Sequence, residues 1–577
     1  MTAESAAAAF IRILREEGVT RVFGNPGTTE LPFLEALQSA PDLEFVLGVH
    51  EGSVVAMADG YARATGRPAF VSLHIAAGLA NGLVGLLNAS RSRTPLVVTA
   101  GQQDQRHLAA DPMLSGDLIG LARAAVKQTF DVRRPSDLPV MLRRAFAAAV
   151  TPPAGPVFLS VPMDVLADPE PVPVPDRSTV AAPGPAAGLP RLAELLRAAR
   201  RPALVAGDGV GRDGAVAELV AVAEAVGAVV YQQPMYDGVN FPGSHPLYAG
   251  MLGATASALR EALDPYDTVL IVGTHAFMPH HYTAGPLVPE HCRILQLDPD
   301  PAEIGRNFGV AYGTVGAVRP SLAELGRLLA GNVSEAEAEA EADAKAVAGR
   351  IADAKAVASR IAEAAAVAAA TRARVDADAR ARYGPAPLDP LAAAHAVAAG
   401  LPADAVVLEE AITTGLKLRQ VLSLDLPKSY VHTVGGGLGS GIGAAIGSRL
   451  GDPSRPVVAV LGDGCALFGL QGLWSASHHE VPVTFVVMNN GEYRTLKDTL
   501  DSWNSVATAS GRYIGLDLAP PHLDFTRVAE FFGIQAARAE SAEHLIDLVA
   551  KAAAGDQPFL IDVPITGHAS APRVPED

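Results

Sequence analysis

The stretch GDGCALFGLQGLWSASHHEVPVTFVVMNNGEY, residues 462–493, decides the fold and indicates the chemistry. It begins where the apolar run 456–462 ends, and a helical pattern then leads to a second apolar run at 483–489. A strand, a helix and a second strand predict two neighbouring parallel strands, whose carboxyl ends lie at one edge of a sheet. Asp463 and Asn490 follow these strands directly, so we expect their side chains to lie close together.

The residues at these two strand ends suit a metal ion bound to a phosphate. Mg²⁺ takes about six oxygen ligands at about 2.1 Å and often receives some of them from phosphate groups. Asp463 and Asn490 each offer a hard oxygen, and Gly464 lets a phosphate approach the backbone. Asp-Gly and Asn-Gly are common turn pairs by themselves. Their occurrence on consecutive strands favours a metal–diphosphate site over two unrelated turns.

Short apolar runs and longer helical patterns alternate along most of the chain. Continuous apolar runs between helices indicate buried parallel strands. We therefore predict an α/β protein with three doubly wound parallel-sheet domains. The predicted strands are FVLGV (45–49), AFVSL (69–73), PLVVTA (95–100), VFLSV (157–161), ALVAG (203–207), DTVLIVG (267–273), RILQLD (293–298), AVVLE (405–409), SYVHTV (429–434), PVVAVLG (456–462), VTFVVMN (483–489) and FLIDV (559–563).

Two segments of unusual composition separate the three domains. The Pro-rich stretch 167–185 cannot pair in a sheet and is predicted to be a linker. The Ala-rich stretch 333–387 is predicted to be a helical spacer. These two segments place the first domain at 1–166, the central domain at 186–332 and the third domain at 388–577.

The spacer contains a direct repeat, in which ADAKAVAGRI (342–351) is followed by ADAKAVASRI (352–361). At about 100° per residue, a repeat of this length drifts by about 80° per copy around a helix. The larger apolar residues are therefore expected to spiral round the helix instead of forming a stripe; they are Val347, Ile351, Val357, Ile361 and Val367. We predict that the spacer is solvated and packs against no core.

Composition excludes several classes of protein. Of the 577 residues, 49% are hydrophobic and only 5% aromatic, which predicts a large aliphatic core and argues against disorder. Only two cysteines are present, so a disulfide scaffold is excluded. The net charge of −17 argues against nucleic acid and anionic membranes as partners. Charged residues interrupt the apolar N-terminal stretch, which is typical of an amphipathic helix and not of a signal peptide, so we expect a cytoplasmic protein.

Several further motifs resemble those of thiamin diphosphate-dependent decarboxylases. They are FGNPGTTELPF (23–33), HEGSVVAMADGYARATGRPAF (50–70), SLHIAAGLANG (72–82) and GGGLGSGIGAAIG (435–447), together with the GDG…NN pattern of residues 462–490. Within that superfamily the motifs are most similar to those of benzoylformate decarboxylases. The resemblance implies that the first domain binds the pyrimidine of the cofactor and the third domain binds its diphosphate.

The resemblance also implies the cofactors and the residues that bind them. Thiamin diphosphate would be held together with Mg²⁺, which Ca²⁺ or Mn²⁺ could replace. The metal ligands would be Asp463, Asn490 and the main-chain carbonyl of Glu492. The cofactor-binding residues would be Asn25, Thr413, Thr414, Gly436, Leu438, Asp463, Gly464, Cys465, Asn490, Tyr493 and Leu496. Cys465 stands where benzoylformate decarboxylases have a serine, and a thiol is the weaker hydrogen-bond donor.

Five residues match catalytic positions of the family. Glu51 would hydrogen-bond to the aminopyrimidine and promote proton exchange, although an acid at a helix N-terminus is also favourable to the helix dipole. His74 matches one active-site histidine, and the second would be His280, which is the better match by register, or the adjacent His281. Thr28 takes the place of a serine that binds the substrate carboxylate. The loop 501–522 could re-line the substrate pocket with Trp503 or Tyr513.

The resemblance implies a reaction and an assembly. The reaction would be the non-oxidative decarboxylation of a small-molecule 2-oxo acid, benzoylformate-like, to an aldehyde and CO₂, with carboligation as a side activity. The alternatives are an acetolactate synthase-like ligase or another lyase with this cofactor, and a degenerate scaffold homologue. Many such ligases hold FAD in the central domain; here GDGVGRDG (207–214) is interpreted as a tight turn, and FAD is not expected. A homodimer would be the minimal unit, paired into a homotetramer.

Overall fold

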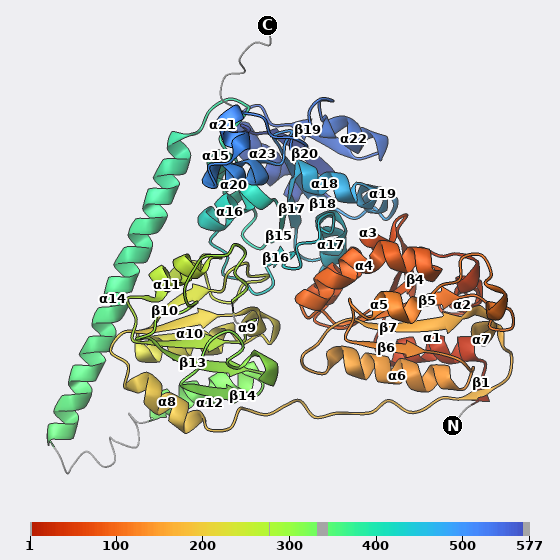
Figure 1. The fold of residues 1–577 in the computed structure, drawn as a ribbon, viewed down its shortest axis with the longest axis horizontal. Helices are drawn as coiled ribbons and strands as arrows, with labels where there is room; N and C mark the ends of the chain where they lie inside the picture. The colour runs from red at the N-terminus through yellow and green to blue at the C-terminus, as the bar shows by residue number, and fades with distance from the viewer. Residues whose placement is uncertain (1–2, 276, 332–343, 569–577) are drawn as a thin grey trace, which may run out of the picture. The chain divides into compact units, whose positions relative to one another are not determined.

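The computed structural model describes residues 3–275, 277–331 and 344–568. Contacts divide the chain into two compact units (Figure 1). The first comprises 1–179, 379–419 and 433–577, and the second comprises 180–378 and 420–432. Within the described residues, no helix is both long enough and apolar enough to cross a membrane. The architecture is three six-stranded parallel sheets with flanking helices, so the predicted fold class is confirmed.

The first sheet has the strand order β3-β2-β4-β5-β7-β6. Its strands are β2 (Arg21–Gly24), β3 (Glu44–Leu47), β4 (Ala69–Leu73), β5 (Leu96–Gln102), β6 (Gln128–Asp131) and β7 (Val157–Pro162). Its helices are α1 (Ala6–Glu16), α2 (Leu31–Leu37), α3 (Glu51–Thr65), α4 (Ile75–Arg91), α5 (Leu118–Ala122), α6 (Asp137–Val150) and α7 (Met163–Ala167). A short antiparallel pair, β1 (Ala3–Glu4) with β8 (Val172–Pro173), ties the start of this domain to its end. The prediction that the Pro-rich stretch 167–185 cannot pair in a sheet was therefore wrong at these two residues, because proline is tolerated in a short edge strand.

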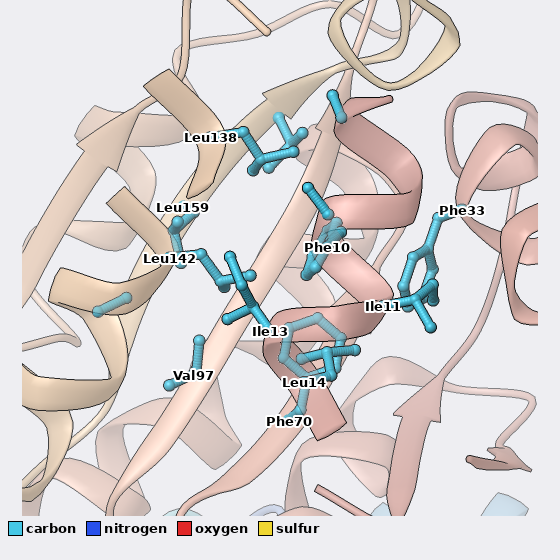
Figure 2. Close-up of a cluster of buried hydrophobic side chains, with 14 of the residues drawn as sticks. Phe10, Ile11, Ile13, Leu14, Phe33, Phe70, Val97, Leu138, Leu142 and Leu159 are labelled. Carbon is cyan, nitrogen blue, oxygen red and sulfur yellow. The ribbon is translucent and has the colours of Figure 1, made fainter. Parts of the chain in front are cut away.

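Helix α1 shows how the sequence builds one face of this domain. The Ser5 side chain accepts a hydrogen bond from the Ala8 N–H and caps the helix, as expected for serine at this position. The buried face of α1 carries Phe10, whose ring lies 4.9 Å from that of Phe33 and 5.5 Å from that of Phe70. Figure 2 shows these rings among the aliphatic side chains of α6 and the strands. Helices α3 and α4 contact β4 and β5 and cover the other face, so the sheet is doubly wound.

The third sheet has the order β16-β15-β17-β18-β20-β19. Its strands are β15 (Val406–Glu410), β16 (Tyr430–His432), β17 (Val457–Gly462), β18 (Val483–Asn489), β19 (Gln535–Arg538) and β20 (Phe559–Pro564). Its helices are α15 (Pro390–Gly400), α16 (Ile412–Val421), α17 (Gly441–Gly451), α18 (Asp463–Gly469), α19 (Gln471–His478), α20 (Arg494–Ser502), α21 (Val506–Ser510), α22 (Phe525–Phe531) and α23 (Ala542–Ala553). Counted along the chain within each domain, the first and third sheets follow one order, 2-1-3-4-6-5.

Helices α3 and α17 join these two domains within the first unit, and they approach each other very closely. A Cβ atom added at Gly447 would lie 1.8 Å from the Met57 carbonyl oxygen, and one added at Gly60 would lie 2.0 Å from that of Ala444. Any side chain at either position would push the helices apart. The glycines of α3 and α17 therefore serve helix packing.

The central sheet has a different order, β11-β10-β9-β12-β13-β14, which is 3-2-1-4-5-6 within the domain. Its strands are β9 (Pro202–Ala206), β10 (Val229–Gln232), β11 (Tyr248–Met251), β12 (Thr268–Val272), β13 (Arg293–Asp298) and β14 (Tyr312–Val315). Its helices are α8 (Leu189–Arg197), α9 (Asp208–Arg212), α10 (Val216–Val226), α11 (Ala256–Leu263) and α12 (Val318–Gly331). The apolar faces of α8, α10 and α12 form one core with the strands.

Within the Ala-rich segment, Ala344–Ala381 form one long helix, α14, and part of it packs against the central domain; positions 333–343 of the segment lie outside the described residues. Ile361 and Ala364 lie on the core of that domain, Ala368 is buried, and the Arg360 guanidinium donates to the Val226 carbonyl at 2.8 Å. The prediction that the spacer packs against no core was therefore wrong. The buried stripe of α14 consists of Ile361 and of Ala364 and Ala368, three and seven residues later. A search for larger apolar residues does not detect a stripe completed by alanines.

Candidate functional site

Asp463 and Asn490 meet at the carboxyl ends of β17 and β18, as the opening motif predicts. One carboxylate oxygen of Asp463 accepts hydrogen bonds from the N–H groups of Asn490 at 3.0 Å and Gly491 at 2.6 Å, and the other accepts the Gly464 N–H at 2.7 Å. The Asn490 side-chain oxygen accepts the Glu492 N–H at 3.1 Å. A single buried carboxylate thus holds the turn 490–492 against the end of the neighbouring strand.

The donors gathered here fit a hard cation. Burial raises the pKa of the Asp463 carboxyl, and the hydrogen bonds from backbone N–H groups act in the opposite direction. A cation beside this carboxylate would stabilise its charged form further. A carboxylate, an amide oxygen and the nearby carbonyl of Glu492 are the oxygen ligands that Mg²⁺ accepts, with phosphate oxygens completing its set.

The residues expected around the diphosphate lie on α18, on α16 and directly after the turn. A Cβ atom at Gly464 would lie 2.7 Å from the Tyr493 ring, so only glycine leaves that ring its place. Cys465 is a free, buried thiol whose pKa is raised by burial and by nearby Glu410, which keeps it in the neutral form. Thr413 and Thr414 lie in the first turn of α16, where Thr414 is buried and Thr413 is half-buried.

Glu51 is the first residue of α3 and is 6% exposed. Its two carboxylate oxygens accept separate amide hydrogen bonds, from Asn25 at 3.1 Å and from Asn81 at 3.0 Å. A Cβ atom at Gly78 would lie 2.8 Å from the carboxylate, so this glycine keeps open the space beside it. The carboxylate is therefore held in one orientation at the end of β3 by residues that follow β2 and lie on α4.

His74 follows β4 and is oriented by a buried carboxylate. Its Nδ1 lies 2.8 Å from Glu30 Oε2 and 3.2 Å from the Thr29 hydroxyl. Glu30 also accepts the N–H groups of Gly27 at 2.8 Å and Gly101 at 3.0 Å, so it is fixed from several sides. With Nδ1–H donating to Glu30, the other ring nitrogen, Nε2, is left to act on a ligand.

The backbone next to His74 is strained. Ile75 has φ of +44°, in the left-handed region that β-branched residues rarely adopt. Strain of this kind persists where the surrounding structure demands it and is frequent at functional sites. It supports a functional position for His74.

The loop that carries Gly436 and Leu438 is held from two sides. Asn88 of α4 donates to the Gly437 carbonyl at 2.8 Å and accepts the Gly437 N–H at 3.0 Å. The buried carboxyl of Glu410, at the end of β15, accepts the N–H groups of Ser440 and Gly441, each at 3.1 Å. Gly436 has φ of +75°, a conformation that requires glycine.

Burial raises the pKa of Glu410 to about 8 against the opposing effect of the backbone N–H groups that bind it. The group is therefore partly or wholly protonated near neutral pH. A neutral carboxyl can still accept both backbone hydrogen bonds, one on each oxygen.

Three of the predicted substrate-side residues are exposed to water. Thr28 is exposed at the start of the 3₁₀ turn Thr28–Glu30. His280 and His281 lie in the second unit, on the segment between β12 and β13, and are exposed. Their Nδ1 atoms are 3.1 Å apart and their rings pack edge to face. Leu496, predicted to contact the cofactor, is 47% exposed on α20.

The glycine-rich turn of the central domain is closed by its own packing. A Cβ atom at Gly207 would lie 2.4 Å from the Gly273 carbonyl oxygen. The buried carboxylate of Asp208 accepts the Asp237 N–H at 2.9 Å and side-chain amides of Asn240 at 2.8 Å and Gln233 at 2.5 Å. Gly207 and Gly209 are thus explained by their close approach to the backbone of Gly273.

Sequence reasoning missed four residues that hold the site in place: Glu30, Asn81, Asn88 and Glu410. Asn81 and Asn88 carried a usable signal, because they are polar, seven positions apart and lie in an otherwise apolar helical stretch. Glu30 resembled an ordinary acid before a helix, and Glu410 resembled a polar residue at the end of a strand. Their roles depend on contacts with residues distant in the sequence, such as Gly101 and Gly441.

Comparison with protein families agrees with this arrangement. The thiamine pyrophosphate enzyme N-terminal TPP binding domain matches residues 4–131, the central domain matches 189–325, and the C-terminal TPP binding domain matches 413–563. The first and third matches contain the two clusters around Glu51 and Asp463.

Relatives and solved structures resemble the chain over nearly its whole length. Benzoylformate decarboxylase of Pseudomonas aeruginosa is 34% identical over 96% of this chain and 97% of its own. A probable acetolactate synthase large subunit of Methanocaldococcus jannaschii is 29% identical over 99% and 93%. The structure of a thiamine diphosphate-dependent 4-hydroxybenzoylformate decarboxylase of Rhodococcus jostii superimposes with a TM-score of 0.83 at 30% identity, covering 98% of this chain and 100% of that chain.

Proposed function

Because this chain belongs to the thiamine pyrophosphate enzyme family, we propose that it decarboxylates a benzoylformate-like 2-oxo acid to an aldehyde and CO₂, using thiamin diphosphate and Mg²⁺. The observation that carries the proposal is His74 bound through Nδ1 to buried Glu30, on the same sheet edge as Glu51. This edge offers one carboxylate and one oriented imidazole for proton transfer. The benzoylformate decarboxylase relatives support the same reaction class.

The third domain would hold the charged end of the cofactor. Asp463, Asn490 and the Glu492 carbonyl would bind Mg²⁺, and Thr413, Thr414 and Gly464 would lie along the diphosphate. When bound, the cofactor supplies a positively charged ring that accepts the electrons released with CO₂. This local positive charge would also favour an anionic substrate despite the net charge of −17.

Glu51 and His74 would move protons at different atoms. Glu51 would hold a proton at the pyrimidine nitrogen, and Asn25 and Asn81 fix its carboxylate for that contact. His74 would donate and accept protons through Nε2 around product formation, because Glu30 occupies Nδ1. Thr28 would meet the substrate carboxylate, and His280 or His281 would supply the second imidazole.

A second candidate is carboligation, in which a second carbonyl compound takes the place of the proton. Acetolactate synthase relatives that match 96–99% of the chain favour it. We expect carboligation as a side activity of the decarboxylase and not as its main reaction. Because the family forms its active sites between subunits, we propose a homodimer as the minimal unit and a homotetramer as the assembly.

The test is a panel of aromatic, branched and short linear 2-oxo acids, each supplied with thiamin diphosphate and Mg²⁺. We expect CO₂ and an equal amount of aldehyde from an aromatic 2-oxo acid without any added acceptor. CO₂ release that requires an added carbonyl acceptor would favour the ligase. No turnover of any panel member, despite bound cofactor, would contradict the decarboxylase proposal.

A further inference from the structure

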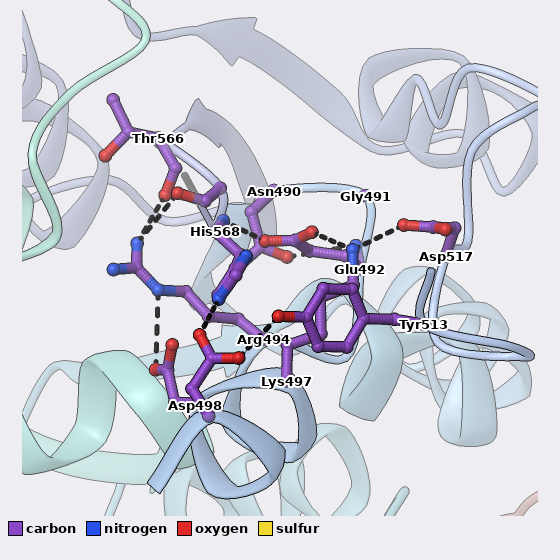
Figure 3. A network of polar contacts seen from close by, with 12 residues as sticks. Asn490, Gly491, Glu492, Arg494, Lys497, Asp498, Tyr513, Asp517, Thr566 and His568 are labelled. Carbon is purple, nitrogen blue, oxygen red and sulfur yellow. Dashed lines mark hydrogen bonds and ion pairs between the residues drawn. The ribbon is translucent and has the colours of Figure 1, made fainter. Parts of the chain in front are cut away.

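A polar network surrounds the turn that would bind the metal, and Lys497 lies at its centre (Figure 3). The Lys497 ammonium is 2.5 Å from a carboxylate oxygen of Glu492 and 2.5 Å from one of Asp517. Its side chain is 6% exposed and that of Glu492 is 9% exposed. The pKa of Lys497 is raised, because its bonds to the two carboxylates outweigh the effect of burial. A nearly buried cation thus connects the turn 490–492 to the later segment of chain around Asp517.

The backbone makes the same connection. The Tyr493 N–H donates to the Leu516 carbonyl at 2.8 Å, and the Leu518 N–H donates to the Gly491 carbonyl at 2.7 Å. Glu492 and Asp517 form an isolated antiparallel bridge between these bonds. Residues 516–518 therefore lie along the turn like a short strand, and Lys497 joins the side chains at the middle of that pairing.

A second arm of the network fixes the helix that carries Lys497. Asp501 lies four residues later on α20, so both side chains are on one face of the helix. The Asp501 carboxylate accepts hydrogen bonds from the hydroxyls of Tyr513 and Thr508 and lies 2.5 Å from His568 Nε2. Tyr513 is therefore engaged inside this network, with its ring 5.6 Å from the Lys497 ammonium. The expectation that Tyr513 re-lines the substrate pocket has no support here.

The charges explain why a cation is needed at this position. Glu492 is the last residue of the turn, Asp463 binds the backbone of the turn, and both acids have little exposure to water. A buried carboxylate without a partner is costly. Lys497 and the backbone N–H of His568 bind the Glu492 carboxylate. The side chain of Glu492 is therefore engaged and would not compete with its own main-chain carbonyl for the metal.

We propose that Lys497 is a positioning residue for the metal: by binding Glu492 and Asp517 together, it holds the turn 490–492 in its metal-binding shape. The inference rests on the proposed function, because it assumes that this turn binds Mg²⁺ with thiamin diphosphate. It assigns a role to a lysine outside the GDG…NN pattern. Loss of Lys497 would weaken metal-dependent cofactor binding without removing any metal ligand.

The test measures binding and does not depend on turnover. Thiamin diphosphate binding is followed by equilibrium dialysis while Mg²⁺ is titrated, for the wild type, Lys497→Met and Lys551→Met. Methionine keeps the apolar stem and removes the charge, and Lys551 is an exposed lysine of the same domain that serves as the matched control. Lys497→Met should raise the Mg²⁺ concentration for half-maximal binding roughly tenfold or more, the expected effect of a lost charge-assisted hydrogen bond beside a buried partner. Lys551→Met should match the wild type.

A second variant covers the case in which Lys497→Met fails to fold. Asp517 is 54% exposed, so Asp517→Asn should fold and should shift the Mg²⁺ requirement in the same direction by a smaller factor. A wild-type Mg²⁺ requirement in every folded variant of Lys497 and Asp517 would overturn the inference. Failure of the wild type itself to bind thiamin diphosphate with Mg²⁺ would instead contradict the proposed function, so the two failures are distinguishable.

Discussion

The first and third domains share one strand order but place different chemistry at corresponding strand ends. Counted along the chain, the third strand of the first domain (β4) is followed by His74, and the third strand of the third domain (β17) is followed by Asp463. The second strand of the first domain (β3) is followed by Glu51, and that of the third domain (β16) by the loop that carries Gly436. The topology brings ligand-binding positions to one sheet edge, and the residues at that edge decide what is bound. Under the proposed function, one domain would move protons and the other would hold a metal and a phosphate.

The central domain sharpens this contrast. Its order, 3-2-1-4-5-6, is the common dinucleotide-binding order, and a glycine-rich turn follows its first strand. Yet that turn packs against Gly273. Asp208, in the same turn, is buried, and its burial is the main reason why its pKa is raised to about 7. A strand order that suits a nucleotide is therefore compatible with a turn built for packing. Function in this chain follows the local residues and not the order of the strands.

The largest expected effect is on cofactor binding by the third domain. Asp463→Ala removes the only carboxylate among the proposed metal ligands and releases the three backbone N–H groups it binds. We expect Mg²⁺-dependent binding of thiamin diphosphate to weaken by more than roughly 100-fold, with loss of activity. Isothermal titration calorimetry measures the binding, and Asp547→Ala, an exposed acid of the same domain, is the control. Normal binding by Asp463→Ala would remove this residue from the metal site.

A smaller effect is expected in the first domain. Glu30→Gln keeps the size of the side chain but weakens its hold on His74 Nδ1, so the imidazole can adopt the wrong tautomer. We expect kcat for the preferred 2-oxo acid to fall roughly tenfold to a hundredfold, with unchanged cofactor binding. Steady-state kinetics and cofactor titration separate the two. If cofactor binding fell and kcat did not, Glu30 would stabilise the fold and would not orient His74 for catalysis.

The smallest effect on activity is expected at Glu410, where the change appears in stability. Its pKa is raised from 4.5 to about 8, so between these values the folded state holds a proton that the unfolded chain has released. Wild-type stability should therefore fall as pH rises through this range. Glu410→Gln should lack this loss. Between pH 5 and pH 9, its free energy of unfolding should therefore rise relative to that of the wild type by on the order of 2–4 kcal/mol.

Urea unfolding at several pH values measures this gain, and the fluorescence of Trp474 and Trp503 reports on the third domain. At low pH the variant can be the less stable protein, because glutamine offers one acceptor oxygen where the carboxyl offers two. The informative quantity is the change of the difference with pH. Parallel curves for the two proteins would show that Glu410 keeps an ordinary pKa.

The sequence alone could predict most interior strands and the strand-end motifs, but it missed the interior strands β2 (Arg21–Gly24) and β10 (Val229–Gln232). Strands β13 and β18 begin and end where the apolar runs RILQLD and VTFVVMN do, because a buried parallel strand is apolar on both faces. The missed strands include β6 and β19, whose sequences QTFD and QAAR carry no apolar run. Both are edge strands, paired on one side only, so burial places fewer demands on their residues.

The candidate site was predictable as far as local motifs reach. Glu51, His74, Asp463 and Asn490 stand in recognisable surroundings, and the structure places each at a strand end. Glu30 and Lys497 were not predictable, because each acts through partners brought near by folding. Asn88 could be singled out as a polar residue in an apolar helix, but its partner could not be predicted. Asn88 binds Gly437 at a distance of 349 positions along the chain.

The central claim, that the first domain activates a cofactor which the third domain holds, is tested most directly by Glu51→Gln. The measurement is the rate at which the C2 proton of bound thiamin diphosphate exchanges with deuterium, followed by NMR after rapid quenching. Glu51→Gln should bind the cofactor and Mg²⁺ like the wild type and exchange the proton roughly 100-fold or more slowly, as expected for the loss of a group that moves a proton. If the variant with bound cofactor exchanged the C2 proton at the wild-type rate, the claim that the first domain activates the cofactor would be contradicted.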